Sequence, residues 1–280
     1  MGDKATLRIW RGNQEGGKFE SYDVETYPGM VVLDAIHEVQ AKQANDLAVR
    51  WNCKAGRCGS CSAEINGKPK LLCMTRMTAF EPGEPITVTP LKTFPLVKDL
   101  VTDVSNNFRV AKKIPPFKPR PKEADGTWRM QQEDIDRIQE FRKCIECFLC
   151  QDVCHVLRDH HKLEEFAGPR FMIHLATLDM HPLDTIDRRP MMKDQMGIGY
   201  CNITRCCTEV CPEHIVITDN GIIPLKERVA DDFYDPLKAI WRKVFPPKHK
   251  KSLPVLPSDP PKAKAGKKTE KKKESADAEE

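Results

Sequence analysis

The apolar residues in the first part of the chain follow two different periods. Ala5 to Trp10 and Phe19 to Val24 place apolar side chains at about every second position, and Gly16-Gly17 stands between them, which predicts a hairpin of two strands. Val31 to Gln40 instead has apolar residues three and four positions apart, which predicts an amphipathic helix packed on that sheet. The apolar positions of this helix are Val32, Ala35, Ile36 and Val39.

The next part of the chain predicts a second hairpin, a short helix and a connector. Ala63 to Pro69 alternates around Asn66-Gly67, a dipeptide typical of two-residue hairpin turns, so Cys73 is expected on or just after the returning strand. Phe94 to Val104 predicts a short helix. The proline-rich segment from Ile114 to Pro121 predicts an extended connector, and we place the domain boundary there.

The second half of the chain is predicted to be mainly helical. Glu133 to Lys143 has apolar residues at three-residue spacing, and further helices are predicted at 169–178, 224–232 and 236–244. From Pro246 onward, prolines and lysines without aromatic residues predict a disordered tail. These segments divide the chain into a first domain at 1–110, a connector at 111–125, a helical domain at 126–245 and a tail at 246–280.

The charge balance argues against one class of function. Of 45 Lys and Arg and 41 Asp and Glu, ten Lys and six acidic residues lie at 248–280, which leaves 35 of each sign in the rest. A formally neutral body argues against a nucleic-acid-binding domain, which concentrates basic charge on one folded face. The chain has no apolar run of 18 residues and no signal peptide, so membrane attachment is expected to come from a partner. Without a signal peptide, the twelve cysteines indicate metal ligation in a reducing compartment rather than disulfides.

Four cysteines of the first domain have the C-x4-C-x2-C…C spacing of a plant-type [2Fe-2S] cluster. They are Cys53, Cys58, Cys61 and Cys73. Gly56 and Gly59 tolerate the positive φ that lets backbone amides of this loop point at the sulfurs. The alternative is a zinc knuckle, which prefers paired C-x2-C units with a longer insert between them. Together with the predicted strands and helix, the loop predicts a β-grasp ferredoxin domain.

Two further cysteine runs follow the C-x2-C-x2-C-x3-C pattern, in which one loop presents three thiolates to one cluster and the fourth cysteine binds the other cluster. The first run is complete, whereas the second has Thr204 where its second ligand is expected. Exchange of the fourth cysteines assigns a [4Fe-4S] cluster to Cys144, Cys147, Cys150 and Cys211. It assigns a [3Fe-4S] cluster, which is one ligand short, to Cys154, Cys201 and Cys207.

Cys206 is left over. It adjoins a ligand and competes with Cys207 for that role, but the C-x3-C-P spacing favours Cys207, so Cys206 is expected to be free and buried. The predicted fold class is α+β, with an N-terminal β-grasp [2Fe-2S] domain and a mainly helical, bacterial-ferredoxin-like C-terminal domain. No Ser/His/Asp or paired-carboxylate motif stands above background, so no catalytic residue is predicted.

This combination of cluster motifs resembles the iron–sulfur subunit of succinate dehydrogenase and fumarate reductase, respiratory complex II. The resemblance covers roughly residues 5 to 245 and is carried by the eleven assigned cysteines and by Pro212. It implies two partners: a flavoprotein that oxidises succinate on covalently bound FAD, and a membrane anchor or cytochrome b subunit at which quinone is reduced. Electrons are then expected to pass from FAD through the [2Fe-2S], [4Fe-4S] and [3Fe-4S] clusters to quinone.

The resemblance also implies a peripheral position at the cytoplasmic face of the cell membrane, held by the anchor subunit. Many quinone-reducing members follow the equivalent of Cys154 with proline and then tryptophans, whereas this chain continues His-Val-Leu-Arg-Asp. Quinone-site residues are therefore not carried over, and the departure favours the fumarate reductase and menaquinone-linked branch. His155 has two interpretations, a hydrogen bond to quinone or a packing role beside the cluster, and the second is favoured.

Two other functions compete with that of a succinate:quinone oxidoreductase subunit. The chain is alternatively the iron–sulfur subunit of a fumarate reductase or of another soluble flavin-linked oxidoreductase. The third hypothesis is a zinc-binding interaction protein without a redox role, although eleven patterned cysteines divide poorly into groups of four. A brown colour that bleaches on dithionite distinguishes the iron–sulfur hypotheses from zinc.

Overall fold

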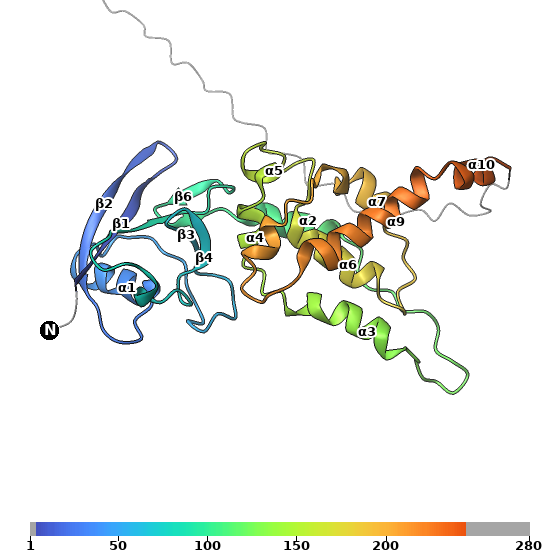
Figure 1. Cartoon of the computed structure of the whole chain (residues 1–280), viewed down its shortest axis with the longest axis horizontal. Coiled ribbons are helices and arrows are strands. Elements are labelled where there is room, and N and C mark those ends of the chain that lie inside the picture. Colours follow the sequence, from blue (N-terminus) through green and yellow to red (C-terminus); the bar gives the residue numbers. More distant parts are fainter. Residues whose placement is uncertain (1–3, 245–280) are drawn as a thin grey trace, which may run out of the picture.

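The chain folds into two lobes that lie end to end. The computed structural model describes residues 4–244, so the tail predicted at 246–280 lies outside the described residues. Figure 1 shows a strand-rich lobe at one end of the long axis and a helical lobe at the other. Each lobe has an apolar core, and the core of the strand-rich lobe also takes in Cys147, Phe148 and Leu149 from the start of the helical lobe. The boundary expected at 111–125 stays a prediction, and the second core already includes Val110.

The strand-rich lobe contains a five-stranded sheet in the order β2-β1-β5-β3-β4. β1 (Lys4–Asn13) and β2 (Gly16–Glu25) form the predicted antiparallel hairpin, and β5 (Ile86–Thr89) lies parallel to β1. Leu7 and Ile9 are fully buried because side chains two positions apart on a strand face the same side of the sheet. The alternating pattern therefore identified the core face of this hairpin.

The second predicted hairpin is formed by β3 (Ser62–Ile65) and β4 (Lys68–Leu71). Its turn residues Asn66 and Gly67 both have positive φ, 48° and 75°, as a two-residue turn of this kind requires. Cys73 lies two residues beyond β4, as expected. The turn of the first hairpin lies at 14–15, so the glycine pair predicted as that turn instead begins β2.

One helix completes the core of this lobe. α1 (Val32–Lys42) buries the predicted apolar face, and its Val32, Ala35, Ile36 and Val39 are all fully buried. These residues share one core with both hairpins, so the helix packs on the sheet. The β-grasp domain and the α+β fold class are confirmed.

The prediction of a short helix from Phe94 to Val104 is wrong. β6 (Leu96–Lys98) and β7 (Val101–Thr102) form a small hairpin there. Asp99 lies between them with a φ of 48°, and its buried carboxylate accepts hydrogen bonds from two backbone N–H groups far away in the sequence, each at 2.9 Å. A turn held by such distant partners leaves no periodic signal in its own segment.

The helical lobe consists of short helices around the second core. Its α-helices are α2 (Ser105–Lys113), α3 (Gln132–Gln139), α4 (Leu149–Asp152), α5 (His155–Arg158), α6 (Pro169–Asp179), α7 (Arg189–Asp194), α8 (Cys206–Glu209), α9 (Ile223–Phe233) and α10 (Pro236–Val244). 3₁₀ turns lie at Glu140–Lys143 and Ile198–Tyr200 and a π-helical turn at Ile217–Ile222, while a further 3₁₀ turn, Met77–Ala79, belongs to the strand-rich lobe. All four helices predicted in this half of the chain are present, as α3 with its following turn, α6, α9 and α10.

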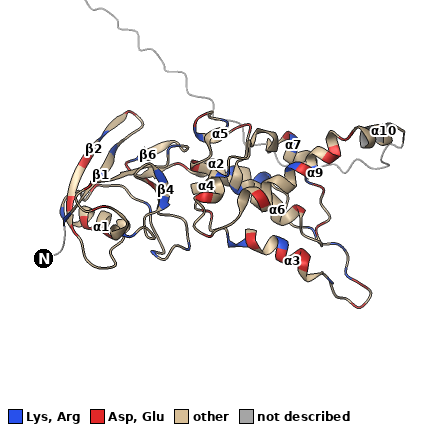
Figure 2. Cartoon of the chain, in the orientation of Figure 1, with Lys and Arg blue, Asp and Glu red and all other residues tan. Residues whose placement is uncertain are grey.

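The surface of the lobes carries charges of both signs. Figure 2 shows acidic and basic residues together on α3 and α9, as expected for helices with one solvent face. Within residues 4–244, no helix is long and apolar enough to cross a lipid bilayer.

A buried arginine attaches the proline connector to the helical lobe. Arg188, whose side chain is fully buried, lies 3.0 Å from the carboxylate of Asp184. It also donates hydrogen bonds to the carbonyl oxygens of Pro115 at 3.1 Å and Pro116 at 3.2 Å. One guanidinium therefore neutralises a buried carboxylate and donates to two connector carbonyls.

Replacement of Arg188 by leucine is expected to lower the free energy of unfolding by about 3–5 kcal/mol, because the Asp184 carboxylate keeps its burial and loses its counter-charge. Denaturant titration of the full chain measures the change. Arg120→Leu is the control, since Arg120 pairs with Glu123 where both side chains are more than a third exposed, and such pairs contribute at most about 1 kcal/mol. An equal decrease in the free energy of unfolding in the two variants would contradict this interpretation of Arg188.

Candidate iron–sulfur centres

All twelve cysteines lie within the described residues and have free thiols. Eleven of them form three groups, one in the strand-rich lobe and two in the helical lobe, as the cavity lining and the electrostatic effects between neighbouring thiols indicate. Each group consists of thiols alone, and soft thiolates are the ligands of iron–sulfur clusters and of zinc. The donor chemistry of all three groups therefore fits the predicted clusters.

The first group forms around the loop that leads into β3. The Sγ atom of Cys53 accepts hydrogen bonds from the backbone N–H groups of Ala55 at 3.4 Å and Arg57 at 3.3 Å. Gly56 and Gly59 both have a φ of 67°, which turns the loop backbone around the sulfurs as predicted. Amide dipoles aimed at a sulfur stabilise its thiolate form.

The β3–β4 hairpin brings the fourth cysteine of this group to the loop. Cys61 directly precedes β3, and its carbonyl oxygen accepts a hydrogen bond from Leu72 N at 3.0 Å, which places Cys73 beside it. Burial raises the pKa of Cys61 to about 12, and the neighbouring Cys73 thiol adds to the rise. Burial also acts to raise the pKa of Cys58, but hydrogen bonds involving Ser60 and Cys53 outweigh it and lower that pKa to about 7.

The two runs of the helical lobe repeat the same backbone conformation. Left-handed residues stand two and four positions after the first cysteine of each run, at Glu146 and Phe148 in one and at Ile203 and Arg205 in the other. A four-residue helix then begins five positions after that cysteine, α4 in the first run and α8 in the second. By this repeat, Thr204 occupies the backbone position that Cys147 has in the first run.

The fold brings the fourth cysteine of the second run to the thiols of the first. One cavity is lined by four thiols and by apolar side chains that include Ile173 and Ile215. The four thiols are those of Cys144, Cys147, Cys150 and Cys211. This is the set that the exchange of fourth cysteines predicts, while its binding of a cluster stays a prediction.

The third group contains the remaining cysteines of the two runs. Burial raises the pKa of Cys154 to about 11, and the nearby thiols of Cys206 and Cys201 contribute to the rise. Burial likewise raises the pKa of Cys207 to about 12, with contributions from Cys206, Cys201 and Cys154. Buried thiols of this kind ionise when a metal binds, so loading of the site is coupled to proton release.

Cys206 lies next to this third group without standing at a ligand position. In the repeat it corresponds to Leu149, the first residue of α4, and not to any cysteine of the first run. Its side chain is half-buried, so the expectation of full burial is wrong, because α8 lies nearer the surface than α4. Its Sγ lies 3.3 Å from the hydroxyl of Thr204.

A charged side chain adjoins the second group of thiols. Arg170 lines the four-thiol cavity and pairs with the carboxylate of Glu146. Burial raises the pKa of Cys144, and the positive charge of Arg170 opposes that rise. A cation at this position favours the thiolate state that iron ligation requires.

Buried polar contacts hold the two lobes together beside the thiol groups. Glu64 on β3 is fully buried and lies 2.9 Å from Arg158 of α5 and 3.0 Å from Lys92. Asp152 of α4 accepts a hydrogen bond from Thr93 N at 3.0 Å. Burial, together with the nearby Glu64, raises the pKa of Asp152 to about 7. These contacts determine how the first cysteine loop sits against the first run.

Sequence reasoning missed Arg170, Glu64 and Asp152. Glu64 lies in a strand whose residues are buried on both faces, and the alternating pattern predicts a solvent face there. The sequence offered one indication of such buried charges, which is a charged residue inside a cysteine run, as Asp152 is between Cys150 and Cys154.

His155 is half-buried at the start of α5, directly after Cys154. The side-chain amide of Asn202, in the second run, donates to its Nε2 at 2.6 Å. His155 therefore links the two cysteine runs at the third thiol group, and its role toward quinone stays untested.

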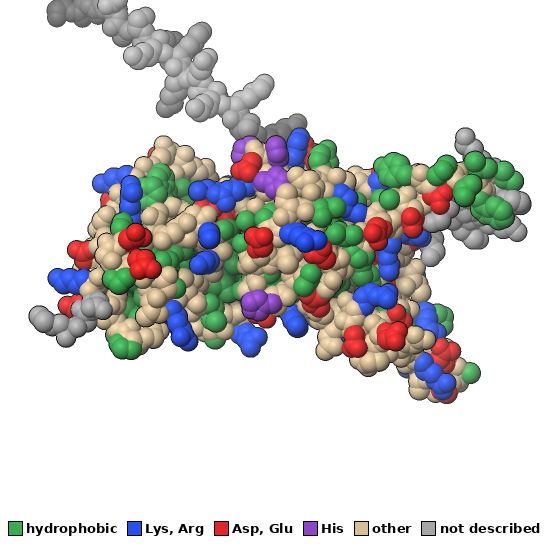
Figure 3. All heavy atoms as spheres, in the orientation of Figure 1, with side chains coloured by type: hydrophobic (Ala, Val, Ile, Leu, Met, Phe, Trp, Pro, Cys, Tyr) green, Lys and Arg blue, Asp and Glu red, His purple; other side chains and the backbone are tan. Residues whose placement is uncertain are grey.

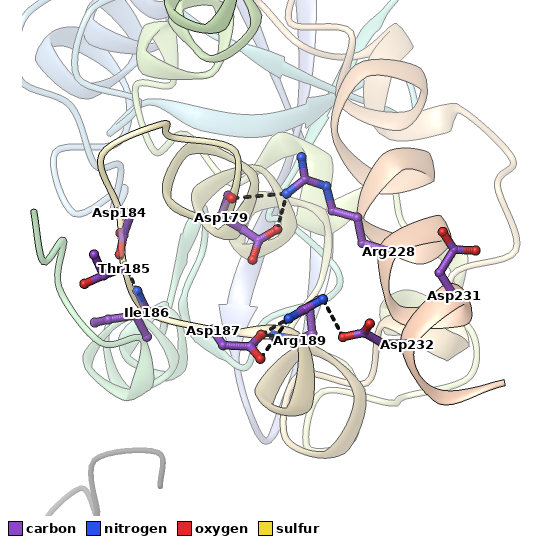
Figure 4. A pocket seen from close by; sticks show the side chains of 9 residues that line it. All are labelled: Asp179, Asp184, Thr185, Ile186, Asp187, Arg189, Arg228, Asp231 and Asp232. Atoms are coloured by element: carbon purple, nitrogen blue, oxygen red, sulfur yellow. Dashed lines mark hydrogen bonds and ion pairs between the residues drawn. The ribbon is translucent and has the colours of Figure 1, made fainter. Parts of the chain in front are cut away.

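A separate hollow lies away from the thiols, among α6, α7 and α9, and Figure 4 shows its charged side chains. Arg228 donates to the carboxylate of Asp179 at 2.8 Å, and Arg189 pairs with Asp187 at 2.8 Å and with Asp232 at 2.5 Å. Burial raises the pKa of Asp179, and Arg228 opposes the rise. These pairs connect the three helices to one another.

Comparisons with known proteins follow the same division into two lobes. Residues 6–109 match the family described as "2Fe-2S iron-sulfur cluster binding domain", and residues 140–215 match the family described as "4Fe-4S dicluster domain". The chain is 32% identical over 227 residues to the fumarate reductase iron-sulfur subunit of Mycobacterium tuberculosis, covering 77% of this chain and 89% of that one.

A second relative and one solved structure give further matches. The chain is 29% identical over 238 residues to the succinate dehydrogenase iron-sulfur subunit of Bacillus subtilis, covering 78% of this chain and 90% of that one. A chain in the structure titled "Mycobacterium smegmatis Sdh1 complex in the apo form" is 63% identical and superposes with a TM-score of 0.81 over 85% of this chain and all of that one.

Proposed function

We propose that this chain is the electron-transfer subunit of a succinate:quinone oxidoreductase. The chain belongs to the family of iron–sulfur subunits of succinate dehydrogenase and fumarate reductase. The observation that carries the proposal is the set of three thiol groups, one in the strand-rich lobe and two in the helical lobe. When bound, the clusters supply one-electron transfer, which no side chain of this chain performs. The residues of the chain hold the clusters, shield them from water and position them.

The ligand assignment follows the three groups. Cys53, Cys58, Cys61 and Cys73 would hold the [2Fe-2S] cluster. Cys144, Cys147, Cys150 and Cys211 would hold the [4Fe-4S] cluster. Cys154, Cys201 and Cys207 would hold the [3Fe-4S] cluster, because the hydroxyl of Thr204 is a far poorer iron ligand than the thiolate at the matching position of the first run.

The third group is where an electron would leave for quinone. The loop from Asn202 to Arg205 is exposed, and so are the nearby Tyr200 and Ile203 side chains. An exposed loop beside a buried cluster is accessible to a partner that carries the acceptor. We assign quinone, in particular menaquinone, and the membrane anchor to this side, and the flavoprotein with its FAD to the [2Fe-2S] side.

The C-terminal end of the described chain presents apolar residues to solvent. Leu237, Ile240, Trp241 and Val244 of α10, with Tyr234 before it, are all at least 60% exposed. Figure 3 shows apolar side chains at the end of the helical lobe where α10 lies. Tyr and Trp are enriched at membrane–water interfaces, so we assign this face to contact with the membrane anchor.

Purification of the tagged full chain from its native membranes tests the proposed function. A flavoprotein with covalent flavin and a haem- or quinone-binding membrane subunit are expected to co-purify with it. Recovery of the flavoprotein alone would instead favour the iron–sulfur subunit of a soluble flavin-linked oxidoreductase. Recovery of a colourless chain containing zinc would exclude any electron-transfer role.

The double change Leu237→Asp and Ile240→Asp is expected to reduce recovery of the membrane subunit, because it places two charges on the exposed apolar face of α10. Visible absorption of the purified chain should stay unchanged, since α10 lies outside the cysteine groups. Val97→Asp, at a half-exposed position on β6, is the control. Normal recovery of the membrane subunit with the double variant would remove α10 from the proposed interface.

Cys211→Ser is expected to remove the [4Fe-4S] signal first, although Cys211 lies beside the residues of the second run. Reduction of the [2Fe-2S] cluster should remain possible while electrons stop reaching quinone. Electron paramagnetic resonance of each cluster, with quinone reduction assayed in parallel, makes the distinction. Cys206→Ser, which changes a cysteine outside the ligand set, should keep all three signals. Loss of the [3Fe-4S] signal alone in Cys211→Ser would show that the ligand assignment is wrong.

Thr204→Cys restores the complete cysteine pattern in the second run and is expected to add a fourth iron. The paramagnetic signal of the oxidised [3Fe-4S] cluster should then disappear, because an oxidised [4Fe-4S] cluster is silent. The added thiolate should lower the reduction potential of this cluster and so slow quinone reduction. Succinate oxidation with an acceptor that takes electrons at the flavin should persist. Thr204→Ser keeps the hydroxyl and should keep the signal. Four irons in the unmodified site would contradict the assignment.

A further inference from the structure

The backbones of the first cysteine loop and the first run touch directly. Gly59 follows Cys58 in the loop, and a Cβ built on Gly59 would lie 2.5 Å from Cα, 2.8 Å from N and 2.9 Å from Cβ of Cys147. No side chain larger than hydrogen fits between them at this distance. The same residue has a φ of 67°, so both the local conformation and the contact require glycine.

A hydroxyl group bridges the same two segments. The Oγ of Ser62, which follows Cys61, lies 2.8 Å from the carbonyl oxygen of Cys147 and 2.9 Å from the carbonyl oxygen of Gly59. Its single proton is therefore shared between one carbonyl of each lobe. Two residues that adjoin thiols of the first group thus meet one cysteine of the second group.

We propose that the contact of Gly59 and Ser62 with Cys147 is the route by which an electron crosses between the two lobes, an inference that rests on the proposed function. Cys58 and Cys61 each lead by one peptide bond to this contact, and Cys147 carries its own thiol on the other side. Electron transfer slows steeply as the gap between donor and acceptor widens, and here the gap is closed by van der Waals contact and one hydrogen bond.

Buried contacts around the route keep it closed. The ion pair of Glu64 with Arg158 and the hydrogen bond from Thr93 to Asp152 join the same two lobes, and Glu64 and Asp152 are fully buried. Opening the route would expose these carboxylates or leave them without partners, which buried groups do not tolerate. Gly59 and Ser62 are therefore positioning residues whose partner is fixed by the docking of the lobes.

The step itself is simple in its balance. With the clusters bound, the [2Fe-2S] cluster would lose the one electron that the [4Fe-4S] cluster would gain. No bond forms or breaks, and no proton has to move along Gly59, Ser62 or Cys147.

Gly59→Ala in the full chain, loaded with its clusters, tests the proposal. The added methyl group meets backbone atoms of Cys147, so the loops must move apart. We expect a severalfold slower equilibration of one electron between the two clusters after rapid reduction, followed by freeze-quench electron paramagnetic resonance. The magnetic relaxation that one reduced cluster induces in the other should weaken in parallel, while the potential of each cluster stays the same.

Two matched variants separate the route from general damage. Gly67→Ala has the same kind of positive φ, 75°, in the β3–β4 turn, but its Cβ would meet nothing within 4 Å, so the electron rate should not change. Ser62→Ala removes the shared proton without adding bulk and should slow electron equilibration between the two clusters. Ser62→Thr keeps the hydroxyl and should restore the rate.

The outcomes distinguish this inference from the proposed function. Unchanged equilibration in Gly59→Ala, with both clusters present, overturns the route. If Gly59→Ala does not load both clusters, Ser62→Ala decides: a slower rate supports the route and an unchanged rate overturns it. Absence of the clusters from the unmodified chain would instead overturn the proposed function.

Discussion

The helical lobe depends on an exchange of cysteines between two loops that are far apart in the sequence. Each loop turns through two left-handed residues so that its thiols face one point, and a four-residue helix then carries the last cysteine of the run away from that point. Cys211 can only reach the four-thiol cavity if the second run lies against the first. The short helices of this lobe are therefore arranged around the cysteine groups.

The three thiol groups differ in their surroundings, and these differences match the roles proposed for them. The first lies in a loop whose Cys53 is exposed. The second is enclosed by apolar side chains, with Arg170 as a nearby positive charge. The third combines buried thiols with an exposed loop at Thr204. Cluster type, nearby charge and exposure all influence reduction potential, so the three proposed clusters would differ in potential.

The junction between the lobes determines how close the first two thiol groups lie. It contains an ion pair between the fully buried Glu64 and the half-buried Arg158. Loss of one partner of such a pair is costly, because the other charge is left buried and unpaired. Such a pair contributes orientation rather than net stability. Close approach of Gly59 to Cys147 is the geometric consequence, because the same docking places both pairs of residues in contact.

The sequence alone determined both hairpins, the main helices, the spacing of the three cysteine motifs and the position of Thr204 within its run. These are local properties: side-chain period reports strands and helices, and ligand spacing along a loop reports which thiols can share one site. The tertiary structure alone decided the hairpin at Asp99, the half-burial of Cys206 and the burial of Glu64. It also brought Ser62 to Cys147, which lies 85 positions further along the chain. Those outcomes depend on how the two lobes dock, and the free energy of docking comes from contacts between distant segments that no local pattern records.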